Sequence, residues 1–223
     1  EQGYNATLGY LFFDEANPEK MNEFIKKLEN DEFPLPFFLT PETHNTPRSA
    51  RFGCNYSKMT YVFNSFLPGI RFILSGFELC DALPYNTGLN FTPEELKQFP
   101  PEKLPLFSIA SMPWLNSNIV RFIQNVNSLV KEFNLTKEKF DVSKIVKLDS
   151  SNPYVVAYKR VLKEFEIIIL GNFSSQEQPT FIECDNSFLK HSEIILGEFC
   201  MNSYNQIILL PFGFAVFKHF KQL

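Results

Sequence analysis

The stretch F-F-L-T-P-E-T-H-N-T-P-R, residues 37–48, changes from apolar to polar side chains within a few positions. Its apolar part, which is entered through prolines, is typical of a buried strand. Its polar part gathers a carboxylate, an imidazole, an amide and a guanidinium on Glu42, His44, Asn45 and Arg48. Such a cluster is either an ordinary loop or the rim of an active site, and the elements around it decide between the two.

Strands and helices alternate on both sides of this stretch. A helix begins after Asn17, whose side chain can cap it, with Pro18 at the first helical position. Apolar runs predict the strands and a 3.6-residue period predicts the helices. The expected strands are 4–13, 33–40 and 70–75. A helix follows each of them: the first begins at Pro18, the second spans 50–66 and the third spans 118–133. This order indicates βα units and a parallel sheet, so the polar cluster stands at the carboxyl end of a strand.

A long segment, residues 80–116, separates the third expected strand from the last helix. It is rich in proline, which argues against regular structure over most of its length. Within it, Thr92, Pro93 and Glu95 form a capping-box pattern that predicts one or two helical turns. A connection of this length inside a compact domain is usually functional, so we expect the segment to shape a site.

The pattern changes after about residue 140. Short β-rich runs divided by turn signals follow one another, with no helical period, at 144–148, 154–161, 165–173, 179–184, 192–200 and 206–218. They predict a small antiparallel β-sandwich. The expected fold class is α/β followed by all-β. The expected domains are 1–138 and 139–223, with the boundary near 136–143.

Composition excludes several function classes. Hydrophobic residues make up 44% of the 223, enough for a core, and the formal net charge is −4. Lys and Arg are scattered along the chain, so no electrostatic footprint for nucleic acid is visible. The longest apolar run, 207–217, is broken by Pro211 and Gly213 and is too short to span a bilayer. We therefore expect neither nucleic acid nor a membrane as a partner.

The four cysteines are far apart and show no metal-binding spacing: Cys54, Cys80, Cys184 and Cys200. Buried free thiols are favoured over disulfides, and no metal or other cofactor is expected. The sequence begins at Glu1 without a methionine or a signal peptide, so it is interpreted as a piece of a longer chain. The absence of a signal peptide and the expectation of unpaired cysteines favour the cytoplasm.

The order of these motifs resembles the end of an α-amylase superfamily enzyme. In that family, strand seven of a (β/α)8 TIM barrel is followed by a His-Asp pair and Thr-Pro-Arg, which His44, Asn45 and 46–48 match except for the acid. The strand-eight pattern is matched by P-G-I-R-F-I-L-S-G-F-E, residues 68–78, with Arg71 where a proline is usual. The resemblance implies the last strands of the barrel, about six to eight, and then the family's β-sandwich. The segments P-Y-N-T-G-L-N-F-T-P-E-E-L and P-P-E-K-L-P-L-F-S further resemble the maltosyltransferase-like branches.

The resemblance also implies a chemistry. The family breaks α-glucosidic bonds with retention: one carboxylate attacks the sugar, and a second acid protonates the leaving oxygen. Both come from strands four and five, upstream of Glu1. Asn45 occupies the position of the family's third acid, which stabilises the transition state, and His44 would donate to the same sugar. Glu42 and Arg48 complete the substrate-binding candidates, with Arg48 mainly ordering the motif, while Glu78 would be a structural acid.

Three functions stay open. The leading hypothesis is the C-terminal portion of an enzyme that hydrolyses or transfers α-1,4-glucosidic bonds of an α-glucan or maltooligosaccharide. The first alternative is a catalytically dead glucan-binding or scaffolding relative that lost the acid at Asn45. The second is a truncated product, inactive and unstable until the missing N-terminal part of the barrel is supplied, because three parallel strands leave a bare edge. Calcium is common in the family, but its usual ligands lie upstream, so none is assigned.

Overall fold

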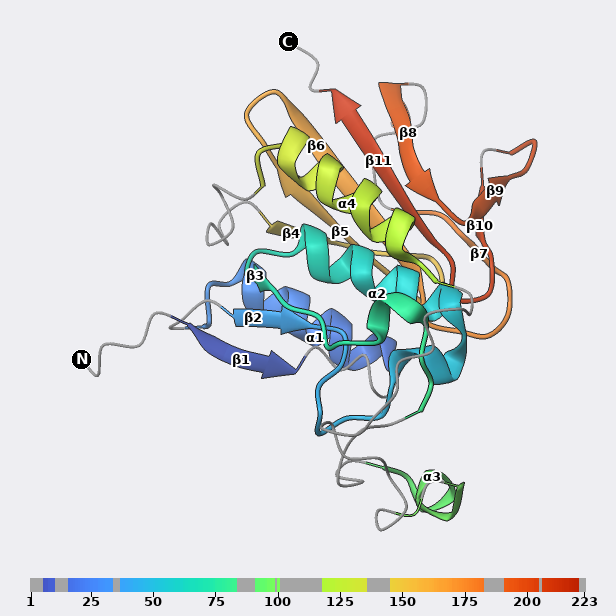
Figure 1. Ribbon diagram of the computed structural model, residues 1–223. Helices are drawn as coiled ribbons and strands as arrows, with labels where there is room; N and C mark the ends of the chain where they lie inside the picture. Colours follow the sequence, from blue (N-terminus) through green and yellow to red (C-terminus); the bar gives the residue numbers. More distant parts are fainter. Residues whose placement is uncertain are drawn as a thin grey trace.

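The computed structural model describes residues 6–10, 16–33, 37–83, 91–98, 100, 118–135, 145–182, 191–204 and 206–220. These residues form layers, with helices between a parallel sheet and an antiparallel one (Figure 1). A second, smaller antiparallel sheet lies beyond the first. The expected order of an α/β part followed by an all-β part is confirmed.

The parallel sheet contains the apolar part of residues 37–48 as its strand β2 (Phe37–Thr40). Its strands are β1 (Thr7–Tyr10), β2 (Phe37–Thr40) and β3 (Ile70–Arg71), in the order β1-β2-β3. Both pairings are parallel, and β2 is the central strand. The third strand is shorter than the expected 70–75, because the chain leaves the sheet after Arg71 and turns into a 3-10 helix, η3 (Phe77–Leu79).

The first helix follows its sequence signals closely. Helix α1 (Pro18–Glu29) begins after Asn17, whose side-chain oxygen accepts the backbone N–H of Lys20 at 3.0 Å. Its apolar stripe is buried as expected: Met21, Phe24, Ile25 and Leu28.

The second expected helix, 50–66, is split. A 3-10 helix, η2 (Ser49–Phe52), precedes α2 (Cys54–Phe66), and Gly53 between them has a φ of 95°. This left-handed conformation favours glycine and interrupts the helical path.

Two further helices complete the first part of the chain. Helix α4 (Val120–Glu132) corresponds to the last expected helix. The short helix α3 (Pro93–Gln98) has the predicted capping box, in which the Thr92 and Glu95 side chains each accept the other residue's backbone N–H. The remainder of the expected loop at 80–116 lies largely outside the described residues.

The all-β part is an antiparallel sandwich. Its larger sheet has the order β4-β5-β6-β11-β8 and its smaller sheet the order β7-β10-β9. The strands of the larger sheet are β4 (Ile145–Leu148), β5 (Val155–Val161), β6 (Phe165–Asn172), β11 (Phe214–Phe220) and β8 (Ser192–Gly197). Those of the smaller sheet are β7 (Gln178–Thr180), β10 (Ile207–Leu209) and β9 (Phe199–Met201). The expected run 192–200 is divided into β8 and β9, and the expected run 206–218 is divided into β10 and β11.

The two parts of the chain share a hydrophobic core. One cluster of buried residues extends from α1, α2 and α4 into the larger antiparallel sheet, and a second fills the space between the two sheets of the sandwich. The Tyr158 hydroxyl and the Arg160 guanidinium of β5 donate to the carbonyls of Phe63 and Phe66 in α2. The helices are therefore covered by the sandwich on one side and by the parallel sheet on the other. The expected domain boundary, near 136–143, lies outside the described residues and stays a prediction.

The parallel sheet leaves apolar side chains uncovered. Leu39 of β2 is buried on the helix side, whereas its neighbour Phe38 is 38% exposed. Successive side chains of a strand point to opposite faces, so Phe38 belongs to the face turned away from the helices. Phe72, just past β3, is 43% exposed.

The prediction for the cysteines is wrong for three of them. Cys54 and Cys80 form a disulfide with a Cα–Cα distance of 5.5 Å, and Cys200 is free but exposed. Cys184 lies outside the described residues. The bonded pair is 26 positions apart, and the sequence gives no sign that the start of α2 meets the end of η3. The argument that unpaired cysteines favour the cytoplasm therefore no longer holds.

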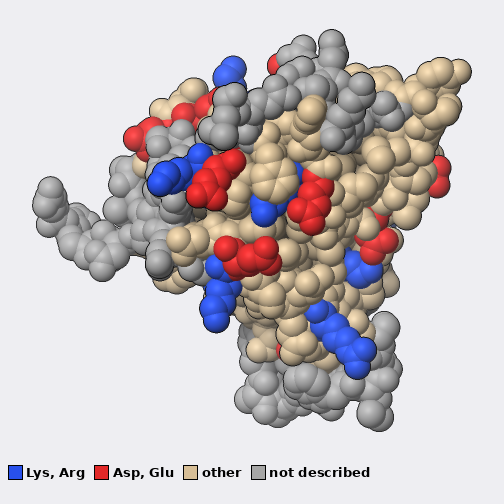
Figure 2. All heavy atoms as spheres, turned by 90° about the horizontal axis from the view of Figure 1, so that it is seen from above, with Lys and Arg blue, Asp and Glu red and all other residues tan. Residues whose placement is uncertain are grey.

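The surface agrees with the charge pattern of the sequence. Acidic and basic side chains lie interspersed on the face seen in Figure 2. Among the described residues, no helix combines the length and the apolar character needed to cross a membrane.

Candidate active site

The polar cluster begins where the central strand of the parallel sheet ends. Thr40 is the last residue of β2, and residues 41–48 lead from there to η2. Because the strands are parallel, the segment that follows β3 leaves the sheet at the same edge. In α/β sheets, residues from successive strand ends meet at this edge and form binding sites.

A tight turn presents two of the predicted site residues. The Thr43 N–H donates to Thr46 Oγ1 at 2.9 Å, and the Thr46 N–H donates to the Thr43 carbonyl at 3.2 Å. Between them, the Asn45 N–H donates to Thr43 Oγ1 at 3.1 Å. Both threonines are buried, while His44 is exposed and Asn45 is half-buried. The turn therefore brings His44 and Asn45 together at its tip.

The other two predicted residues form a buried ion pair below the turn. Glu42 Oε1 lies 3.1 Å from Arg48 Nε, and both side chains are 1% exposed. Glu42 Oε2 also accepts the backbone N–H of Ser49 at 2.6 Å. Burial raises the pKa of Glu42, against the opposing effects of the Arg48 charge and the Ser49 hydrogen bond. Neither charged group has an exposed surface for a sugar to contact.

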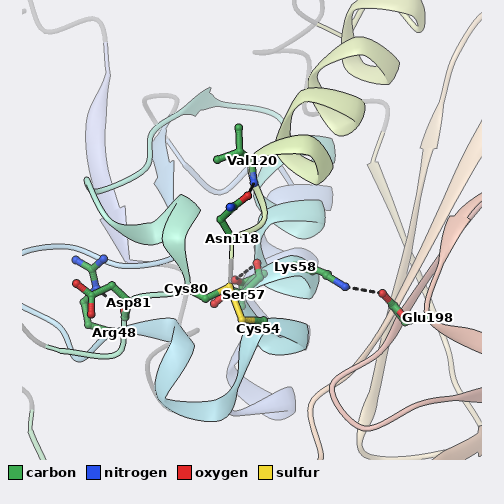
Figure 3. Close-up of a disulfide and its surroundings, with 10 residues drawn as sticks. Arg48, Cys54, Ser57, Lys58, Cys80, Asp81, Asn118, Val120 and Glu198 are labelled. Carbon is green, nitrogen blue, oxygen red and sulfur yellow. Dashed lines mark hydrogen bonds and ion pairs between the residues drawn. A yellow bond between two sulfur atoms is a disulfide. The ribbon is translucent and has the colours of Figure 1, made fainter. Parts of the chain in front are cut away.

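Arg48 connects the cluster to the segment that follows β3. Its Nε donates to the carbonyl of Asp81 at 3.1 Å (Figure 3), and its two terminal nitrogens both donate to the carbonyl of Ser75 at 3.1 Å. The carboxylate of Glu42 thus supplies the counter-charge while the two carbonyls take the hydrogen bonds. This guanidinium fixes the separation of the two strand-end segments.

Sequence reasoning did not identify Ser75 and Asp81 as members of the cluster. They bind through backbone carbonyls, which every residue type carries, so no side-chain pattern marks them. Glu78 has the structural part expected of it, since its Oε2 accepts the N–H of Gly76 at 3.0 Å.

Arg71, the last residue of β3, contacts residues of α2 and α4. Arg71 donates to Asn127 Oδ1, which also accepts the Tyr61 hydroxyl at 2.8 Å. These residues line a cavity of about 430 Å³ between β3, α2 and α4. The cavity shares no residue with the 40–48 cluster, so it is separate from the candidate site.

The described residues contain no group of three or more His, Cys, Asp or Glu side chains that could hold a metal ion. At the cluster, His44 and Asn45 can form hydrogen bonds with a ligand, and the Glu42–Arg48 ion pair lies beneath them.

Comparison with solved structures finds 227 matching chains. Trehalose-6-phosphate hydrolase of Bacillus licheniformis matches with a TM-score of 0.60 and 16% identity, over 91% of this chain and 47% of its own. The α-amylase of H. orenii matches with a TM-score of 0.59 and 13% identity, over 97% of this chain and 49% of its own. An isomaltulose synthase variant of Erwinia rhapontici NX5, solved with its natural substrate sucrose, matches with a TM-score of 0.64 and 12% identity, over 97% of this chain and 51% of its own.

These likenesses are to α-amylase family enzymes and concern the fold. This chain spans about half the length of each of the three. No protein-family model matches the sequence, and no curated protein matches it. The resemblance to maltosyltransferase-like branches stays a prediction.

Proposed function

We propose that this chain is the C-terminal half of an enzyme that hydrolyses or transfers α-glucosidic bonds, with residues 40–48 forming part of its sugar-binding site. The observation that carries the proposal is the position of this cluster at the carboxyl end of β2, in a fold shared with α-amylase family enzymes. The finer proposal is action on α-1,4 bonds of a maltooligosaccharide or α-glucan. On this view, β1, β2 and β3 are the last three strands of a barrel.

The four predicted residues divide into two roles. His44 and Asn45 stand at the tip of the turn and would touch the sugar, His44 through its imidazole and Asn45 through its amide. Glu42 and Arg48 are buried beneath them, and we assign them to positioning rather than contact. Arg48 does this by fixing the turn to Ser75 and Asp81, while Glu42 balances its charge.

The reaction needs two carboxylates that this sequence does not supply at the cluster. The resemblance implies that the nucleophile and the general acid stand on strands upstream of Glu1, and the matching structures are about twice as long as this chain. Retention of configuration follows when the first carboxylate attacks the sugar and water or an acceptor sugar later displaces it.

Asn45 decides how well such a site would work. A carboxylate at this position would accept hydrogen bonds from sugar hydroxyls and place negative charge beside an oxocarbenium-like transition state. The amide of Asn45 can accept a hydrogen bond but carries no charge. Hydrogen bonds to charged groups are roughly twice as strong as neutral ones, and losing one transition-state contact costs about 10²–10³ in rate.

The test is an assay of the full-length protein with maltoheptaose, with cleavage and transfer products separated by chromatography. We expect turnover by the natural protein and an increase of about 10²–10³ in kcat for Asn45→Asp, because the restored charge acts on the transition state. Asn125→Asp makes the same change at an exposed position of α4 and should leave kcat unaltered. Absence of turnover by both the natural protein and Asn45→Asp would reject the enzyme proposal.

The amide at Asn45 also favours the second candidate, a glucan-binding protein without activity. Calorimetric titration with maltoheptaose separates the two. Binding that His44→Ala weakens, with no turnover by any variant, would support a binding function. Absence of both binding and turnover would reject the second candidate as well.

A further inference from the structure

We propose that the Cys54–Cys80 disulfide is a redox-sensitive clamp that holds the two strand-end segments of the candidate site together. Its effect on the turn at 43–46 stands on the geometry alone. Its effect on catalysis rests on the proposed function.

The disulfide joins the segments that carry the cluster. Cys54 is the first residue of α2, a few positions after Arg48, and Cys80 directly follows η3. Figure 3 shows the bond between the start of α2 and the segment after η3, with Arg48 and Asp81 beside it. The residue after Cys80 is Asp81, whose carbonyl accepts the hydrogen bond from Arg48. One covalent and one hydrogen-bonded link therefore connect the same two segments.

The neighbouring contacts define what the disulfide controls. The carbonyl of Glu78, in η3, accepts the N–H of Ile119 at 2.8 Å, which ties η3 to the start of α4. The segment after η3 has the disulfide at Cys80 and the Arg48 contact at Asp81, and the N–H groups of Cys80 and Asp81 donate to the carbonyls of Phe77 and Gly76 at 3.1 Å each. Opening the disulfide would leave these hydrogen bonds in place but remove the covalent link to α2, so that Cys80 and Asp81 could shift relative to α2 and Arg48.

The bond is open to a reducing agent. Both cysteines are only partly buried, and Cys54 lines a cavity of about 370 Å³ with Phe52, Asn55 and Phe212. The sulfur of Cys54 stands at the N-terminus of a 13-residue helix, where a thiolate is stabilised. Cys54 is accordingly the better leaving group of the two.

The reductive step uses a dithiol as the electron donor. One of its thiolates attacks the Cys80 sulfur, the Cys54–Cys80 bond breaks, and Cys54 leaves as a thiolate. The second thiol of the reagent then displaces Cys80 from the mixed disulfide and closes the reagent's own disulfide. The cysteine pair takes up two electrons and two protons, and the dithiol loses the same number.

A shift of Asp81 would change the position of the turn that carries His44 and Asn45. Arg48 would lose a fixed acceptor, and its guanidinium is the cation that faces the buried carboxylate of Glu42. Glu42 in turn accepts the N–H of Ser49. The backbone that presents His44 and Asn45 runs from Glu42 to Arg48. Hydrogen bonds between Thr43 and Thr46 hold the shape of the turn, and the clamp would set the position of the turn as a whole.

Peptide mapping tests the bond itself. The full-length protein, purified without reductant, is alkylated, digested and analysed by mass spectrometry. We expect a peptide pair linked through Cys54 and Cys80, with Cys200 alkylated. Complete alkylation of Cys54 and Cys80 in the folded protein would overturn the proposal.

Amide hydrogen exchange tests the positioning. Reduction with dithiothreitol should speed exchange in residues 42–49 at least tenfold, leave β5 and β6 unchanged, and be reversed on reoxidation. Cys200→Ser should respond in the same way as the natural protein. The double variant Cys54→Ser/Cys80→Ser should exchange fast in 42–49 with or without reductant. If reduction of the natural protein leaves exchange in 42–49 unchanged, the clamp has no positioning role.

Kinetics give a separate reading. In an active full-length enzyme, reduction should lower kcat about tenfold or more with a smaller change in KM, because Asn45 acts in the transition state. Unchanged kcat would overturn the catalytic consequence. Peptide mapping and hydrogen exchange need no activity, so failure of the clamp and failure of the proposed function give different results.

Discussion

At the scale of single residues, Glu42 is an ionisable group whose side chain is removed from water. Its carboxylate is buried beneath the turn, with Arg48 and the Ser49 N–H as its partners. Burial disfavours the charged form more than these partners favour it, so the pKa of Glu42 is raised above the usual 4.5. Protonation of Glu42 is therefore more favourable in the folded protein than in the unfolded chain.

This direction fixes the pH dependence of stability. The contribution of Glu42 to folding is fully present below the unfolded pKa of 4.5 and is lost as pH rises through the folded pKa. Glu42→Gln imitates the neutral form. We expect the melting temperature of the natural protein, relative to Glu42→Gln, to fall as pH rises from 4.5. The corresponding free energy changes by at most about 1.4 kcal/mol per pH unit.

Glu94→Gln, which alters an exposed acid of α3, reports the general effect of losing one negative charge. A melting temperature of the natural protein that rises relative to that of Glu42→Gln as pH increases would mean that attraction to Arg48 exceeds the cost of burial.

At the scale of elements, the contact between β6 and α2 joins the two parts of the chain. Gly171 of β6 faces α2, and a Cβ at that position would lie 2.4 Å from Cε2 of Phe63 and 3.0 Å from Sδ of Met59. The absence of a side chain at Gly171 lets the strand and the helix approach closely.

Gly171→Ala should therefore destabilise the protein by about 1–3 kcal/mol, since the added methyl group overpacks this contact. Thermal unfolding of Gly171→Ala, Phe63→Leu and the double variant measures the effect. Because leucine removes the ring that the methyl group meets, we expect the double variant to lose less than the sum of the single losses. Additive losses would show that the strain is relieved elsewhere.

At the scale of the whole molecule, the parallel sheet has one face without a cover among the described residues. Phe38 exposes apolar surface there, Phe72 exposes apolar surface just past the end of β3, and the structural relatives are about twice as long as this chain. We propose that the missing half of the barrel covers this face. Burying a side chain of this size contributes about 1.5–3 kcal/mol.

The double variant Phe38→Ser/Phe72→Ser should have opposite effects in two settings. In the 223-residue chain alone, it should raise the fraction that stays in solution after centrifugation, because it removes exposed apolar surface. In the full-length protein, it should lower the melting temperature, because the two rings would then be buried.

Phe220→Ser, at a side chain of β11 that is 50% exposed, serves as the control and should leave the full-length melting temperature nearly unchanged. Equal melting temperatures for Phe38→Ser/Phe72→Ser and the natural full-length protein would contradict the proposed cover. A monomeric 223-residue chain that melts cooperatively would contradict the expectation that it is unstable alone.

The sequence by itself determined the features that depend on near neighbours. The cap at Asn17, the stripe of α1 and the capping box at Thr92 involve residues three or four positions apart, so periodicity and residue type are enough to predict them. The same holds for the alternation of strands and helices and for the position of His44 and Asn45 after a strand. The interruption of the second helix at Gly53 was missed, because the apolar period continues across it.

Only the tertiary structure decided which distant segments meet. It paired Cys54 with Cys80, set Arg48 against the carbonyls of Ser75 and Asp81, and buried Glu42. These contacts depend on the path of the chain between segments, and backbone carbonyls carry no residue-specific signal. The polar cluster at 40–48 could thus be located from the sequence, but the division between a contacting tip and a buried support required the fold.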